Sequence, residues 1–178
     1  MEEKNNKIFL IASDFHDSML ALERTLELAT ECHANKIILL GDIFGAHAYE
    51  MVERLNTVAY KLTIVKGNND GFADELPDKD FKVFDQTYEN INGKIAYLCH
   101  GNKLNWARAD ELGAKILMFG HFHVPMLKKE NGLLLLCPGS MAQPRSSVGK
   151  TFAVITPEKI QIIRENGDVL EEMKIDEI

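Results

Sequence analysis

The chain has 178 residues, of which 46% are apolar, and its formal net charge is -7 at pH 7. This length and apolar content suit one globular domain with its own core, so we expect a single domain over residues 1–178. The acidic balance argues against a long nucleic-acid partner, because affinity for a phosphate backbone comes largely from Lys and Arg. A small phosphorylated substrate remains compatible, because bound divalent metals would supply local positive charge.

Three features of the sequence predict a cytoplasmic protein. The cysteines Cys32, Cys99 and Cys137 are odd in number and form no C-x-x-C pair, so they indicate neither a disulfide framework nor a thiolate zinc site. The start of the chain, MEEKNN, is polar and acidic, whereas a signal peptide begins with a basic and then an apolar segment. Because no apolar run approaches the length of a membrane span, we expect no membrane partner.

The first half of the chain alternates short apolar runs with amphipathic stretches, a pattern typical of alternating strands and helices. Leucines at helical spacing predict a helix over Asp17–His33, and Tyr49–Asn56 has the same character. The predicted strands of this half are Lys7–Ser13, Lys36–Leu40 and Lys61–Val65.

The second half begins with a predicted hairpin around Asn92-Gly93 and becomes richer in strands. A helix is predicted over Asn102–Leu112, with a stop at Gly113. Alternating units followed by a β-rich tail predict an α/β fold in which two sheets pack face to face with helices outside. The predicted strands are Lys94–Cys99, Ala114–Phe119, Met126–Lys129, Leu133–Cys137, Thr151–Thr156, Ile160–Glu165 and Val169–Ile175.

Side chains that can bind metals follow five of the predicted strands. In open α/β sheets, ligands bind at the carboxyl ends of the strands, so these five ends can converge on one site. Glycines precede Asp42, Asn68 and His121, where they would permit sharp turns and a close approach of the backbone. The seven candidate metal ligands are Asp14, His16, Asp42, Asn68, His100, His121 and His123.

The candidates together indicate two divalent metal ions rather than one. A short motif such as D-x-H or G-D is common in turns, but two Asp, one Asn and four His in one order exceed the needs of one ion. A carboxylate that bridges two cations would offset their repulsion, and Asp42, central in the order, is the candidate. Nitrogen and oxygen ligands without thiolate suit manganese, which we expect, or iron, zinc, nickel or cobalt.

In this order, the motifs D-x-H, G-D, G-N-x-D, H-G and G-H-x-H resemble the calcineurin-like metallophosphoesterase superfamily. The short length, the G-N-N-D variant and the turn Pro138-Gly139-Ser140 resemble its small YfcE-type phosphodiesterase branch. The resemblance runs from Asp14 to about Arg145, and it implies a four-layer αββα sandwich of two mixed β-sheets flanked by helices. It also implies that one metal is held by Asp14, His16, Asp42 and His123, and the other by Asp42, Asn68, His100 and His121.

Two positions depart from the family pattern. Asn69, which we expect to contact the substrate, stands where many members have a histidine that contacts phosphate and assists the leaving group. This departure predicts a preference for good leaving groups. Asn102 stands where many YfcE-like proteins have histidine; its amide can donate to a phosphate oxygen but cannot supply a proton near neutral pH. Arg145 is a further candidate phosphate contact, although a solvated surface arginine is an equally good interpretation.

The sequence therefore predicts a phosphodiesterase in which a hydroxide that bridges two metals attacks phosphorus in line with the departing alcohol. Asn68 and His100 would take part in catalysis as well as in metal binding, and Asp70 would orient neighbouring groups. Two alternatives stay open: a phosphomonoesterase or nucleotide pyrophosphatase, and a non-catalytic protein-interaction scaffold of the same fold. A homodimer or higher homo-oligomer is compatible with the β-rich tail and the resemblance.

Overall fold

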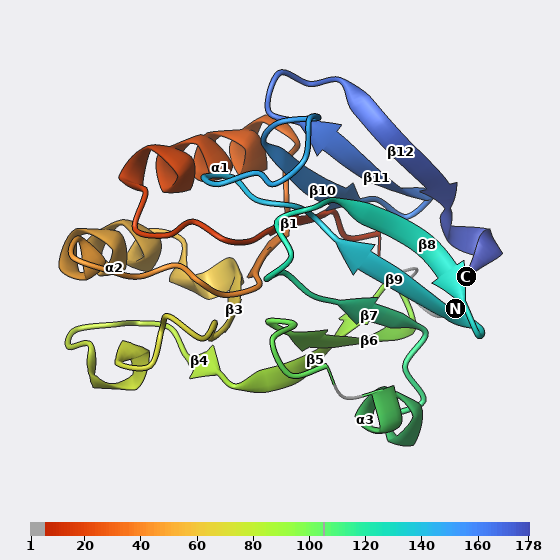
Figure 1. Cartoon of the computed structure of the whole chain (residues 1–178), viewed down its shortest axis with the longest axis horizontal. Helices are drawn as coiled ribbons and strands as arrows, with labels where there is room; N and C mark the ends of the chain where they lie inside the picture. Colours follow the sequence, from red (N-terminus) through yellow and green to blue (C-terminus); the bar gives the residue numbers. More distant parts are fainter. Residues whose placement is uncertain (1–5, 105) are drawn as a thin grey trace.

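The structure is a computed structural model, and it describes residues 6–104 and 106–178 (Figure 1). The first five residues of the polar N-terminal segment, and residue 105 within the predicted helix Asn102–Leu112, lie outside the described residues. Within the described ranges, no helix has the length and apolar content that crossing a membrane would require. The α-helices of these ranges are α1 (Met19–Glu31), α2 (Ala48–Asn56) and α3 (Trp106–Glu111).

The first sheet has seven strands in the order β12-β11-β10-β1-β2-β3-β4. Strands β1 to β4 are parallel, and β10 to β12 form an antiparallel meander that joins β1 through β10. All seven carry backbone hydrogen bonds to their neighbours. They span Phe9–Ala12 (β1), Lys36–Leu39 (β2), Leu62–Val65 (β3), Val83–Phe84 (β4), Thr151–Ile155 (β10), Lys159–Arg164 (β11) and Val169–Lys174 (β12).

The second sheet has five strands in the order β5-β6-β7-β9-β8. Its three central strands, β6, β7 and β9, are parallel, and the edge strands β5 and β8 are antiparallel to their neighbours. Both sheets are therefore mixed. The strands span Gln86–Ile91 (β5), Lys94–Cys99 (β6), Ile116–Met118 (β7), Met126–Glu130 (β8) and Leu133–Cys137 (β9).

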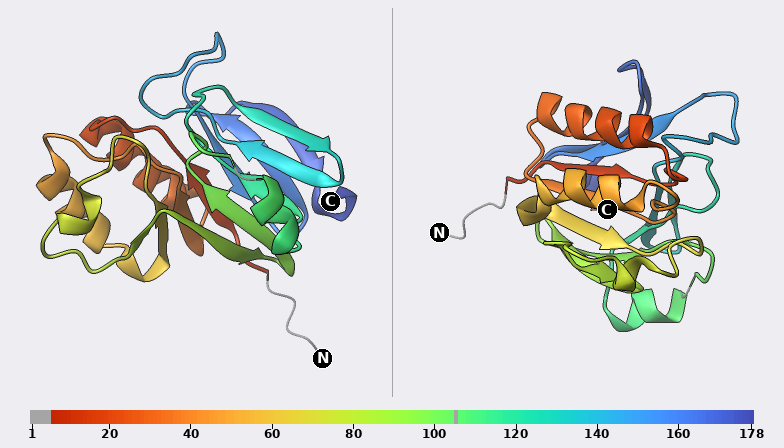
Figure 2. Two further views of the ribbon diagram at one scale, coloured as in Figure 1. Left: turned by 60° about the horizontal axis from the view of Figure 1, so that its bottom comes forward. Right: turned by 90° about the vertical axis from the view of Figure 1, so that its left-hand side faces the viewer.

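Three buried clusters separate four layers of structure. Neighbouring residues of a strand point to opposite faces, so Leu10 of β1 packs with α1 and α2, whereas Ile11 packs against the second sheet. In β6, Leu98 belongs to the core between the sheets, and Tyr97 and Cys99 pack with buried Ala109 of α3 on the outer face. Figures 1 and 2 show α3 on the side of the molecule opposite to α1 and α2.

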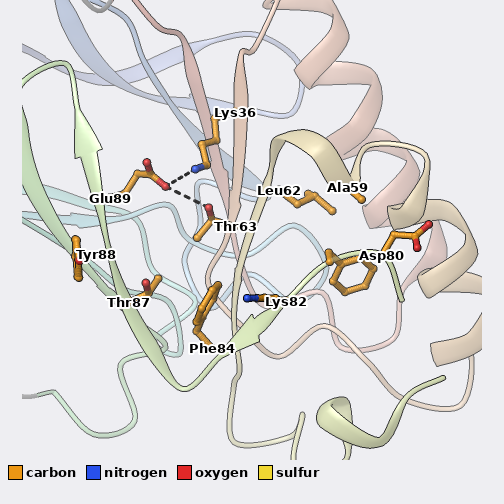
Figure 3. Close-up of a pocket in the computed structure, with 11 residues that line it drawn as sticks. Lys36, Ala59, Leu62, Thr63, Asp80, Lys82, Phe84, Thr87, Tyr88 and Glu89 are labelled. Carbon is orange, nitrogen blue, oxygen red and sulfur yellow. Dashed lines mark hydrogen bonds and ion pairs between the residues drawn. The ribbon is translucent and has the colours of Figure 1, made fainter. Parts of the chain in front are cut away.

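The two sheets are also joined by a polar contact at one edge. Lys36 of β2 places Nζ 2.5 Å from Oε2 of Glu89 on β5. The hydroxyl of Thr63 on β3 donates to the same oxygen at 3.2 Å. Figure 3 shows these side chains in a hollow beside Phe84 and Tyr88. One carboxylate of the second sheet thus binds two strands of the first.

The predicted fold class is confirmed: two mixed sheets pack face to face with helices on the outside. The strands of the β-rich tail are divided between the two sheets rather than forming one continuous run of hairpins. Its first hairpin, β8–β9, completes the second sheet, and β10 to β12 complete the first. Short apolar runs predict strands, but their patterns do not distinguish the two sheets, because both have the same alternation of buried residues.

Candidate metal centre

The loops that follow β1 and β2 are tied together by backbone hydrogen bonds. The amide of Asp14 donates to the carbonyl of Gly41 at 3.0 Å, and the amide of His16 donates to the carbonyl of Asp42 at 2.8 Å. In the second sheet, the amide of Gly120, after β7, donates to the carbonyl of His100, after β6, at 2.7 Å. Each pair of neighbouring parallel strands therefore delivers its predicted ligands side by side.

Predicted ligands adopt an unusual backbone conformation. A positive φ is uncommon outside glycine and costs of order 1–3 kcal/mol where the surroundings impose it. Such residues concentrate at functional sites, where the fold holds side chains in required positions. Five predicted ligands have positive φ: Asp14 (58°), His16 (44°), Asp42 (52°), His121 (68°) and His123 (60°).

Glycines allow the ligand loops to approach one another closely. A Cβ atom on Gly67 would lie 2.1 Å from Oδ1 of Asp42, and one on Gly41 would lie 2.6 Å from Nδ1 of His100. A Cβ atom on Gly120 would lie 1.9 Å from the hydroxyl of Ser13. The predicted need for glycine before Asp42, Asn68 and His121 is confirmed.

One group of ligands consists of two carboxylates and two imidazoles whose ligand atoms all lie within 4.8 Å of one another. Nε2 of His16 is 3.1 Å from Nε2 of His123 and 3.7 Å from Oδ2 of Asp42. Nε2 of His123 is 3.2 Å from Oδ1 of Asp14. Four nitrogen and oxygen atoms this close together could bind one divalent cation.

A second group shares Asp42 with the first and adds His100 and His121. Nε2 of His100 is 3.4 Å from Oδ2 of Asp42, and the rings of His100 and His121 are 5.1 Å apart. Asn68 and His100 line one cavity of about 550 Å³, which also includes Asn102. Asp42 thus stands between two sets of side chains, as a bridging ligand would.

Two histidines have their tautomers set by backbone carbonyls. Nδ1 of His100 is 2.7 Å from the carbonyl of Leu40, and Nδ1 of His123 is 2.7 Å from the carbonyl of Gln143. Because a carbonyl only accepts, each Nδ1 carries the proton, and each neutral ring offers a lone pair at Nε2. Nε2 of His100 is buried and makes no hydrogen bond within the described part of the chain. A bound cation would satisfy this atom, so the residues fit a metal.

Burial shifts the pKa values of the ionisable side chains in the site. Burial raises the pKa of Asp14 from 3.8 to about 6. Burial acts on Asp42 in the same direction, but His100 and the Asn69 amide outweigh it and lower the Asp42 pKa to about 2. Burial lowers the pKa of His16 below its ordinary value. A cation between these groups would favour the ionised carboxylates and the neutral imidazoles.

Asp70 and Asn69 lie around Asp42. The carboxylate of Asp70 is fully buried and accepts hydrogen bonds from the amides of Ile43, Phe44 and Gly67 at 2.8–2.9 Å. Asn69 donates two hydrogen bonds to the Asp42 carboxylate, one from its backbone nitrogen at 3.0 Å and one from the side-chain Nδ2 at 2.8 Å. Asp70 therefore ties the loop that follows β3 to the residues directly after Asp42, and Asn69 holds the carboxylate itself.

Arg145 and Asn102, predicted to contact substrate, are both exposed at the rim of the centre. The amide of Arg145 donates to the carbonyl of His123 at 3.0 Å. Burial lowers the pKa of His123, and the positive charge of Arg145 adds to this shift. Asn102 lines the cavity beside His100. The contact of either side chain with a substrate phosphate stays a prediction.

Several groups that support the ligand loops are not among the predicted site residues. The hydroxyl of Ser140, in the turn after β9, donates to the carbonyl of Asp14 at 2.7 Å and accepts from the amide of Gln143 at 2.8 Å. This bond connects the loop that orients His123 to the loop that carries Asp14. The carbonyls of Leu40 and Gln143 act through the backbone, so their residue types give no indication of the role.

The chain matches a known protein family and is similar to two bacterial proteins. A model of the calcineurin-like phosphoesterase superfamily domain matches residues 8–159. Phosphodiesterase YfcE of Escherichia coli (strain K12) is 27% identical over 169 residues, covering 88% of this chain and 91% of that protein. Probable metallophosphoesterase YsnB of Bacillus subtilis (strain 168) is 29% identical over 176 residues, covering 93% and 95%.

Solved structures share the fold. The structure of YfcE, a phosphoesterase from E. coli, has a TM-score of 0.80 at 24% identity and covers 94% of this chain and 99% of its own. Vacuolar Protein Sorting 29 from Cryptosporidium parvum has a TM-score of 0.69 at 19% identity, with coverage of 95% and 98%. At these identities the structures establish a common architecture.

Proposed function

This chain belongs to the calcineurin-like phosphoesterase superfamily, and we propose that it is a metal-dependent hydrolase that cleaves a phosphodiester. The observation that carries the proposal is the position of Asp42, which two groups of potential metal ligands share. The named relative YfcE, a phosphodiesterase, supports the diester as the substrate class.

Two divalent cations are the proposed cofactors, and manganese is the first to test. Nitrogen and oxygen donors without thiolate also suit iron, zinc, nickel and cobalt. Bound cations would neutralise charge on the phosphoryl oxygens and lower the pKa of a water molecule. The residues that would hold them are Asp14, His16, Asp42 and His123 for one ion, and Asp42, Asn68, His100 and His121 for the other.

The remaining side chains would bind and orient the substrate. Asn102 can donate a hydrogen bond to a phosphate oxygen, and the guanidinium of Arg145 can pair with the phosphate charge. Asn69 holds Asp42 and has no proton to give to a departing alkoxide near neutral pH. We therefore infer that the site prefers esters whose leaving groups depart without protonation.

The main alternative is a protein-interaction scaffold, since solved structures of Vacuolar Protein Sorting 29 share this architecture. Among the described residues, His100 Nε2 is buried without a hydrogen bond, and a scaffold has no chemical need for this. It also has no need for the positive φ angles of the ligand loops. These features favour the hydrolase. A phosphomonoesterase or nucleotide pyrophosphatase is the second alternative, and the substrate comparison below separates it from a diesterase.

The cellular setting is also a proposal. Cys32, Cys99 and Cys137 are all free thiols, and burial raises the pKa of Cys99 and Cys137 to about 12, which keeps them unreactive. These features support a cytoplasmic location, and a homodimer is the proposed assembly.

The test compares hydrolysis of bis-p-nitrophenyl phosphate with that of p-nitrophenyl phosphate by metal-stripped protein, with and without Mn²⁺. The diester should be cleaved faster, and cleavage should require the metal. Asp42→Asn should abolish turnover, whereas Asp168→Asn, an exposed carboxylate in the turn between β11 and β12, should not change it. Absence of turnover with every divalent metal would favour the scaffold.

A further inference from the structure

Phe122 occupies an unusual place for a large apolar side chain. It lies between His121 and His123, one ligand from each proposed metal site, and it is 44% exposed. Exposed apolar residues are ordinary on protein surfaces when they are scattered. The other large exposed apolar side chains mostly lie on helices or edge strands, such as Tyr60, Tyr88 and Val169. Phe122 and the exposed Val124 instead lie in the loop that carries the predicted ligands His121 and His123.

The ring of Phe122 is held in a fixed orientation by two aromatic neighbours. It makes an edge-to-face contact with the His121 imidazole at 5.6 Å between centroids, and another with Phe119 at 5.8 Å. Phe119 is 3% exposed and belongs to the core under α3, so it anchors the cluster to the second sheet. A ring that is supported on one side and open to solvent on the other can accept a planar partner.

The position of Phe122 relative to the proposed metal sites follows from the contacts between neighbouring rings. His121 is 5.1 Å from His100, the ligand whose Nε2 faces Asp42. Phe122 therefore contacts the second ligand group directly, through the ring of His121, which belongs to that group. A phosphate held by that group would have its ester substituent within reach of the exposed side of Phe122.

We propose that Phe122 is a specificity residue that stacks on an aromatic group of the substrate, so that the diester cleaved at this site carries an aromatic ring on an ester substituent. The inference rests on the proposed function, because it requires a phosphate at the metal centre. Stacking of a planar ring on an aromatic side chain strengthens binding, and we expect an effect of about tenfold in affinity.

The test measures binding rather than turnover. Phenylphosphonate and methylphosphonate cannot be hydrolysed, and they share the group that would contact the metals. Isothermal titration of the metal-loaded full chain with each gives two Kd values, and changes in metal occupancy cancel in their ratio. The unaltered protein should bind phenylphosphonate about tenfold more tightly than methylphosphonate. Phe122→Ala should bring the ratio close to one, and Phe122→Tyr, which keeps the ring, should preserve it.

Phe84→Ala is the matched control, because Phe84 is 37% exposed but lies in the hollow of Figure 3, which none of the seven proposed ligands lines. It should leave the ratio unchanged. Equal affinity of both phosphonates for the unaltered protein, or an aromatic preference that survives Phe122→Ala, would overturn the proposal. Hydrolysis of bis-p-nitrophenyl phosphate is measured separately and tests the proposed function. A failure of the Phe122 proposal is therefore not mistaken for a failure of the proposed function.

Discussion

Nε2 of His16 faces Nε2 of His123 at 3.1 Å, although the two residues are 107 positions apart in the chain. The carbonyl of Gln143 fixes the proton of His123 on Nδ1, so Nε2 of His123 is an acceptor. A hydrogen bond between these two Nε2 atoms therefore requires His16 to donate the proton. A cation that binds both nitrogens requires His16 to release that proton or to move it to Nδ1.

The His16 tautomer should therefore change on metal binding. Proton–nitrogen correlation spectra of the imidazoles should show the His16 proton on Nε2 in the metal-free protein. Adding Zn²⁺, which is diamagnetic, should move it to Nδ1 while His123 and His100 keep theirs on Nδ1. A metal-free His16 that is already protonated at Nδ1 would contradict this reading of the pair.

Metal binding should stabilise the fold. A ligand at 100 times its Kd adds about 2.7 kcal/mol to the free energy of unfolding. For a chain of this size, that is an increase of roughly 5–10 °C in Tm. Thermal unfolding with Mn²⁺ and with EDTA measures the difference. The increase should be lost in Asp42→Asn and kept in Asp168→Asn.

Metal affinity should fall in mild acid. The pKa of Asp14 is raised to about 6, so the metal-free carboxyl carries a proton below that pH and the cation must displace it. The pKa of His100 is also raised above 6.5, because Asp42 outweighs the opposing effect of burial, and this acts in the same direction. From pH 7 to pH 5, affinity for Mn²⁺ should fall at least about tenfold. Calorimetric titration at the two pH values checks this, and an unchanged Kd would show that Asp14 is not a ligand.

Asp70 should be a major contributor to stability. Its carboxylate is buried and accepts from three backbone amides, so Asp70→Ala would leave three donors without a partner. The expected loss is about 3 kcal/mol or more in the free energy of unfolding. Urea unfolding measures it. The matched change at an exposed carboxylate, Asp168→Ala, should cost less than about 0.5 kcal/mol.

A methyl group at Gly67 should displace Asp42. The Cβ atom of Gly67→Ala would lie 2.1 Å from Oδ1 of Asp42, so the carboxylate must move from its place between the two ligand groups. We expect metal affinity to fall at least about tenfold. Gly71→Ala, where an added Cβ meets no atom within 4 Å, is the control and should stay within about twofold. Equal affinities in the two variants would mean that the position of Asp42 does not determine metal binding.

Much of this architecture could be predicted from the sequence, because apolar runs such as Lys36–Leu40 and Leu133–Cys137 have a clear strand pattern. The division of the tail between two sheets could not. Strand β4, Val83–Phe84, is two residues long and too short to give a periodic signal.

Within the site, the candidate ligands and the orienting role of Asp70 could be named in advance, but the other supports could not. Ser140 acts through its hydroxyl on a residue 126 positions away, and local sequence does not predict contacts of that separation. Phe122 reads as an ordinary apolar residue until its exposure and its contact with His121 are known. Chemistry that depends on side-chain type was visible in the sequence, whereas chemistry that depends on proximity was not.

The order of folding follows from the way the ligands are divided. Asp14 and Asp42 extend from β1 and β2 of one sheet, whereas His100, His121 and His123 follow β6 and β7 of the other. Neither sheet alone provides all of the proposed ligands for either ion, so we expect tight metal binding to follow the docking of the two sheets. Once bound, each cation would cross-link the two halves of the chain at one end of the sandwich. A chelator would then remove the cross-link between the two sheets, because the ions that form it are also the proposed catalytic ions.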